Sequence, residues 1–151
     1  MEVKDQVCTL EQAKKLKELG VKQEALWFWV YPTKESMISS GLDIYYHLQA
    51  KDIIGDNEGD EFDNSMASAF GVAELGVIMP DEIFKNDWCY TLRCDKRDDN
   101  WTVNYTAESE TSEWGINDIN GFTEKNEASA RSQMLIYLLE NNLIDKTTIN
   151  T

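Results

Sequence analysis

The spacing of apolar and polar residues predicts three helices and four strands, in the order α-β-β-α-β-β-α. The first helix is predicted over residues 9–19. Thr9 and Gln12 have the spacing of a capping box, and Gly20 follows as a stop. Local signals therefore mark both ends of this helix.

An aromatic and β-branched run over 25–31 ends at Pro32 and predicts a strand that is covered on both faces. A second strand over 43–48 contains His47, and the two strands are expected to pair antiparallel. Alternation along the first strand places three aromatic residues on one face: Trp27, Trp29 and Tyr31.

The middle of the chain contains an acidic loop followed by a short helix. Six acidic residues lie within 52–63, and the segment 52–64 is predicted to be a solvated loop. The apolar residues of 72–79 predict an amphipathic helix that Pro80 closes, and a second helical turn is expected to start at this proline.

A β-hairpin is predicted next, because apolar residues alternate from Trp88 to Cys94 and again from Trp101 to Tyr105. We expect Trp88 and Trp101 to form a cross-strand pair in the core. The segment 107–121 loses this periodicity and is predicted to be a polar but ordered excursion.

The last predicted helix runs from about residue 125 to 141, with Thr123 as its candidate cap. Its apolar residues form a band wide enough to be buried against a sheet: Ala128, Met134, Leu135, Ile136, Leu138 and Leu139. Residues 146–151 are expected to fray.

The fold class that follows is α+β, in a single domain over 1–151. Neither hairpin can bury an apolar face alone. We therefore predict one antiparallel sheet made from the two hairpins, with the helices packed on one of its faces.

Composition and charge narrow the possible functions. The chain has 14 basic and 28 acidic residues, a net charge of -14, which disfavours direct binding to nucleic acid or to anionic membranes. No apolar run approaches the ~18 residues of a membrane span, and the first residues lack the pattern of a signal peptide. The three cysteines are an odd, sparse set that is typical of the reducing cytoplasm.

The residues predict no catalytic, metal or cofactor site. His47 is the only histidine, and no nucleophile motif accompanies it. Cys89 and Cys94 are five positions apart on a predicted strand, so their thiols point to opposite faces. The acidic residues from Asp56 onward fail the spacing of a calcium-binding loop, and phosphate-binding glycine motifs are absent.

Aromatic residues supply the candidate binding residues. Those of the first strand resemble a stacking platform for a ligand, although core packing is the favoured role for them. We take four residues as a candidate binding site: Trp27, Trp29, Tyr31 and His47.

Three stretches carry a family resemblance: VCTLEQAKKL at 7–16 with LG at 19–20, AFGVAELG at 69–76 with MP at 79–80, and EASAR at 127–131 with MLIYL at 134–138. With the hairpin around Trp101, they resemble a group of small uncharacterised proteins from phages and mobile elements of gut bacteria. The resemblance implies a setting and no mechanism. The chain has Gly71 where that group tends to have threonine, which is the better helix cap.

These observations favour a non-enzymatic, acidic accessory or interaction protein of phage or mobile-element origin, with a protein as its partner. One alternative is a DNA mimic that inhibits a nucleic-acid-binding enzyme of the host. The other is a small hydrolase or nucleotide-binding protein that uses carboxylates, with His47 as its titrating group. An uncovered aromatic strand face would also permit a homodimer.

Overall fold

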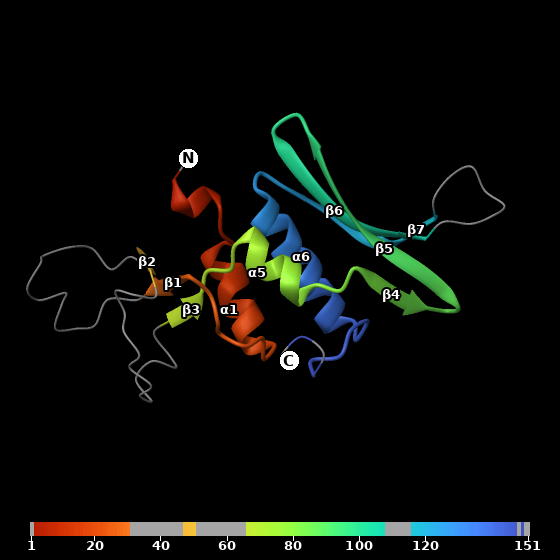
Figure 1. Ribbon diagram of the computed structural model, residues 1–151, viewed down its shortest axis with the longest axis horizontal. Coiled ribbons are helices and arrows are strands. Elements are labelled where there is room, and N and C mark those ends of the chain that lie inside the picture. Colours follow the sequence, from red (N-terminus) through yellow and green to blue (C-terminus); the bar gives the residue numbers. More distant parts are fainter. Residues whose placement is uncertain (1, 31–46, 51–65, 108–115, 148, 150–151) are drawn as a thin grey trace, which may run out of the picture.

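The computed structural model of the chain describes residues 2–30, 47–50, 66–107, 116–147 and 149 (Figure 1). Its elements are the 3₁₀ turn η1 (Val3–Asp5), α1 (Leu10–Glu18), β1 (Trp27–Val30), β2 (His47–Ala50), β3 (Met66–Ser68), α5 (Val72–Ile78), β4 (Glu82–Lys85), β5 (Trp88–Arg97), β6 (Asn100–Ala107), β7 (Ile116–Glu124) and α6 (Glu127–Glu140). The α+β class is confirmed. None of the helices in the described ranges is long and apolar enough to cross a membrane.

The strands form two antiparallel sheets, so the prediction of a single sheet is wrong. One sheet has the order β2-β1-β3 and the other the order β4-β5-β6-β7. Helix α1 packs on β3 and on α6, while α6 packs on β6 and β7, so that the helices lie between the two sheets (Figure 1). Each predicted hairpin gains further strands, and each resulting sheet has an apolar face for the helices to cover.

Local signals placed α1 correctly. The Thr9 hydroxyl accepts a hydrogen bond from the Gln12 amide at 3.2 Å, and the Gln12 side chain accepts one from the Thr9 amide at 3.0 Å. The Gln12 amide group also donates to the buried carbonyl of Ser129 at 3.1 Å, which ties α1 to α6. The chain leaves the helix through Gly20, whose φ of 86° is the left-handed conformation that glycine favours.

The helix predicted over 125–141 is confirmed, but its cap is Asn126 and not Thr123. Thr123 belongs to β7, where its hydroxyl lies 2.9 Å from that of Thr102. The Asn126 side chain accepts a hydrogen bond from the Ser129 amide at 2.7 Å. Helix α6 buries the six residues of its predicted apolar band and also Ser129, Ala130 and Ser132.

Strand β4 replaces the helical turn that was predicted to start at Pro80. Asn86 and Asp87 have φ values of 52° and 65°, and they join β4 to β5 through a two-residue turn of the type that favours asparagine and aspartate. The Tyr105 hydroxyl donates to the Pro80 carbonyl at 2.5 Å, and burial raises the pKa of this tyrosine. This hydrogen bond holds the start of β4 against the core.

Strand β7 lies partly in the segment predicted to be a polar excursion. Its register against β6 shifts between Val103 and Tyr105 and again between Tyr105 and Ala107. Such bulges break the alternation of apolar and polar residues that predicts a strand. Strand β7 was therefore not predicted from the sequence, although its Ile119 is buried in the core.

The predicted core pair of Trp88 and Trp101 is wrong. Asp98 and Asp99 form a tight turn that places Trp101 opposite Lys96, whereas Trp88 lies opposite Lys85 at the other end of the sheet. Trp88 is 39% exposed.

Several other predictions fall partly or wholly outside the described residues. These are the acidic loop 52–64, the first part of the strand predicted over 43–48 and half of the tail 146–151. The described residues of that strand, His47 and Leu48, belong to β2, which extends to Ala50 and pairs antiparallel with β1 as predicted. Within the tail, Ile149 is buried.

Trp29 fixes the N-terminal segment to β1, because its indole N–H donates to the Cys8 carbonyl at 3.1 Å. A Trp29→Phe substitution removes this donor and leaves the carbonyl without that partner. We expect the free energy of unfolding to fall by about 1 kcal/mol, measured by urea denaturation. Trp88→Phe, at an exposed site, serves as the control, and an equal loss in both variants would contradict this role of Trp29.

Cys8 is buried, and burial raises the pKa of its thiol to about 12. The unfolded thiol has a pKa of about 8.5. Stability contributed by this difference is complete below about pH 8.5 and is lost as the pH rises towards 12, because the unfolded thiol ionises first. At about pH 9, we expect iodoacetamide to alkylate Cys8 only in urea-unfolded protein, as mass spectrometry would show. Alkylation of folded protein at Cys8 as fast as at half-buried Cys89 would refute this.

Candidate binding cleft

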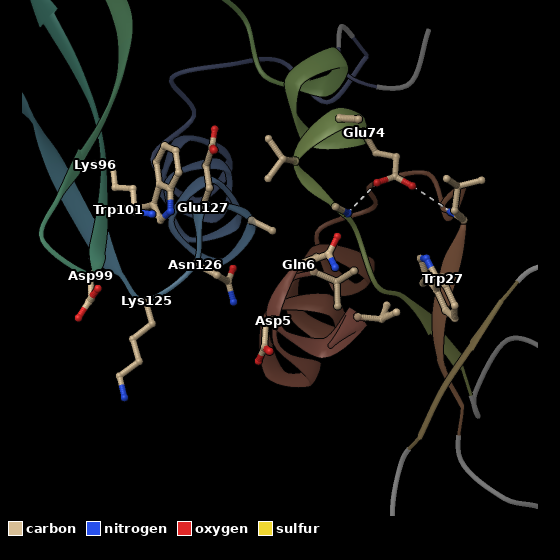
Figure 2. A pocket seen from close by; sticks show the side chains of 17 residues that line it. Asp5, Gln6, Trp27, Glu74, Lys96, Asp99, Trp101, Lys125, Asn126 and Glu127 are labelled. Atoms are coloured by element: carbon tan, nitrogen blue, oxygen red, sulfur yellow. Dashed lines mark hydrogen bonds between the residues drawn. The ribbon is translucent and has the colours of Figure 1, made fainter. Parts of the chain in front are cut away.

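A cleft lies where five segments of the chain meet: the N-terminal segment, the start of β1, the start of α5, the β5–β6 turn and the start of α6. It is open and has a volume of about 780 Å³. Figure 2 shows it from close by, with Asp5 and Gln6 between the two sides. The lining residues thus come from positions far apart in the sequence.

Apolar groups form two opposite sides of the cleft. Trp101 lies on the side of the β5–β6 hairpin, and Trp27 lies on the side of β1 (Figure 2). Each indole is partly exposed. Leu26 also lines the cleft and is 69% exposed. The cleft therefore exposes apolar surface to water on both of its sides.

Charged groups of both signs border these indoles. The Lys96 ammonium lies 5.7 Å from the centre of the Trp101 ring, within the range of a cation–π interaction. Lys125 and Asp99 line the same side, and neither forms an ion pair with another described residue (Figure 2). Asp5 lies between the two sides and accepts a hydrogen bond from the Glu2 amide.

The other two carboxylates of the cleft are already engaged in hydrogen bonds. Glu74 accepts from the Leu26 amide at 2.9 Å and from the Gly71 amide at 2.6 Å, which are the dashed lines in Figure 2. Glu127 pairs with Arg131 one helical turn later, with an oxygen–nitrogen distance of 2.7 Å. Glu74 joins the start of β1 to the start of α5, and Glu127 stiffens the first turns of α6.

The four residues predicted as a binding site do not come together as one described group. Trp27 lines the cleft, whereas the Trp29 indole is directed to the Cys8 carbonyl and packs against the core. Tyr31 lies outside the described residues. His47 is described only as a strand position opposite Val30, without its side chain.

Trp101 is the cleft residue that sequence reasoning missed, because alternation predicted a core position for it. The indole does pack against the core on one side, so the prediction captured half of its environment. The partial exposure of Trp101 depends on segments that are distant in sequence and contact it only in the folded chain. No local sequence pattern predicts it.

The described cysteines lack the environment of a reactive or metal-binding thiol. Cys89 lies opposite Phe84 and Cys94 opposite Val103 along the unbroken ladder of β5, so they face opposite ways, as predicted. Burial raises the pKa of both thiols, whereas an activated thiol has a lowered pKa. Among the described residues, no three His, Cys, Asp or Glu side chains are grouped to hold a metal ion.

No protein-family model matches the chain, and no curated protein or solved structure is similar to it. The resemblance to phage and mobile-element proteins therefore stays a prediction, and the cleft has to be interpreted from its own residues.

A Glu74→Gln substitution tests the hydrogen bonds that hold the β1 side of the cleft. A neutral amide offers one accepting oxygen in place of two charged ones, so one backbone N–H loses its partner. We expect the free energy of unfolding to fall by about 1–2 kcal/mol in chemical denaturation. Glu140→Gln is the control, because it removes only an exposed ion pair with Lys15 and should cost at most about 0.5 kcal/mol. Equal effects would argue against the bridging role of Glu74.

Proposed function

We propose that this protein is a non-enzymatic binding module, and that the cleft between Trp27 and Trp101 takes a segment of a protein partner. The observation that carries the proposal is the pair of partly exposed indoles on opposite sides of an open cleft. Tryptophan is among the residues that dominate the binding energy of protein interfaces, where it typically lies near the centre of the contact. An apolar side chain of the partner inserted into the cleft, against either ring, would use this arrangement.

The charge of the chain supports a basic protein partner. A net charge of -14 attracts cationic surfaces at long range and speeds their association. The same charge repels phosphate backbones, which argues against nucleic acid in the cleft. Within the cleft, Asp5 and Asp99 offer carboxylates to basic residues that flank the inserted apolar side chain.

The resemblance to phage and mobile-element proteins supplies a setting for this function. A small accessory protein in that setting would act on a protein of its bacterial host. The partner would have an apolar residue flanked by lysine or arginine, on an extended segment or a helix end that can enter an open cleft.

The proposal is tested by a Trp27→Ala variant. Trp27 lines the cleft, and the core formed by the described residues does not include its side chain, so we expect the variant to fold. The immobilised full chain would capture host proteins from a bacterial lysate, and the affinity of each recovered protein would be measured by calorimetry. We expect Trp27→Ala to weaken the cleft partner at least about tenfold, since a central interface tryptophan contributes more than about 1.4 kcal/mol.

Trp88→Ala is the matched control, because Trp88 is exposed but lies outside the cleft. Its affinity should stay within about twofold of the wild type. Equal affinities of wild type and Trp27→Ala for every recovered protein would refute the cleft as the binding site. A hydrolase activity of the purified chain that Trp27→Ala abolishes would refute the non-enzymatic part of the proposal.

A further inference from the structure

Strand β4 is an open edge of the four-stranded sheet, far in the fold from the cleft residues. It pairs with β5 on one side only. The Asp81 carbonyl accepts a hydrogen bond from the Leu92 amide at 2.8 Å, which sets the alternation along the strand. Ile83 and Lys85 therefore also direct their backbone groups to β5, while those of Glu82 and Phe84 point away from the sheet. Among the described residues, these outward groups have no backbone partner.

The side chains at this edge leave apolar surface exposed. Phe84 is 77% exposed, and Val77 at the end of α5 is 87% exposed. Both line a groove of about 290 Å³ beside β4, to which Leu143 and Ile144 also contribute. An unpaired strand edge with an exposed phenylalanine is a ready site for pairing with another strand.

We propose that a second copy of this chain occupies the edge, and that two β4 strands pair antiparallel about a two-fold axis. The two four-stranded sheets would then form one continuous sheet of eight strands. The alternation of the backbone groups requires that outward-directed residues hydrogen-bond to each other. With the axis at Ile83, Glu82 of one copy lies opposite Phe84 of the second copy.

Charge complementarity selects this register. With the axis at Ile83, Asp81 of each copy lies opposite Lys85 of the second copy, so two opposite-charge pairs form by symmetry. Moving the axis to Glu82 places the Glu82 carboxylates of the two copies, which carry like charges, opposite each other. Moving it to Phe84 leaves Lys85 opposite an isoleucine.

The exposed phenylalanines also fit this register. The Phe84 side chains of the two copies lie on the same outer face at diagonal positions, within reach of each other. Their contact would remove from water the largest apolar side chain that the strand exposes. The groove beside β4 would be covered by the second copy as it runs along the edge.

Charge reversal tests the register. Asp81→Lys and Lys85→Asp each place like charges opposite each other in a homodimer, so each variant alone should dimerise at least about tenfold more weakly than the wild type. An equimolar mixture of the two variants restores both opposite-charge pairs, and sedimentation equilibrium should show heterodimers of wild-type strength. Asp95→Lys, on β5 away from this edge, changes the net charge equally and should leave the dimer unchanged.

Phe84→Pro tests the backbone pairing separately. The Phe84 amide points away from β5, so proline spares the intramolecular ladder but removes an intermolecular donor. Circular dichroism should show a folded chain, and sedimentation should show a monomer. A wild type that remains monomeric at about 100 μM, a mixture of charge variants that stays monomeric, or a folded Phe84→Pro dimer would each overturn the proposal. None of these variants touches the cleft, so the binding function is tested independently.

Discussion

The burial of helix α6 is the constraint on which both halves of the molecule depend. One side of this helix packs on β6 and β7, and other sides contact α1 and α5. Alanine and serine at 128–130 and 132 let neighbouring backbones approach closely, while Met134, Leu135 and Leu138 are fully buried. Each such large side chain contributes about 1.5–3 kcal/mol through its removal from water. Without α6, the four-stranded sheet would lose the cover of its apolar face.

The elements with local signals were predictable from the sequence, and the arrangement of the sheets was not. Thr9 and Gln12 predicted the start of α1, and alternating apolar residues predicted the β5–β6 hairpin. Strand β3 is three residues long and follows the acidic segment. It is too short for an alternation of apolar and polar residues to be detected. The pairing of β3 with β1 joins residues more than thirty positions apart in the sequence. This long-range pairing contributes to the division of the strands into two sheets.

The cleft was predictable only in part, for a related reason. Trp27 stood out because it belongs to an aromatic run, but the same run predicted an equal role for Trp29. The difference arises from a single acceptor, the Cys8 carbonyl, which directs the Trp29 indole inward. Trp101 becomes a cleft residue through its neighbours from the N-terminal segment and from α6. Sequence patterns report which residues are apolar, whereas tertiary packing decides which of their edges remain open.

The contact between Gly71 and Glu74 limits which residues position 71 can hold. A Cβ atom at position 71 would lie 2.9 Å from the Glu74 carboxylate oxygen that binds the Gly71 amide, so any larger residue displaces that carboxylate. A threonine there would add a cap that glycine lacks, because its hydroxyl would accept a hydrogen bond from the Glu74 amide. With the Glu74 carboxylate still accepting from the amide of residue 71, the two bonds would form the kind of capping box that Thr9 and Gln12 form at the start of α1. Because the same carboxylate also holds the Leu26 amide, a side chain at position 71 would alter the anchoring of the segment before β1.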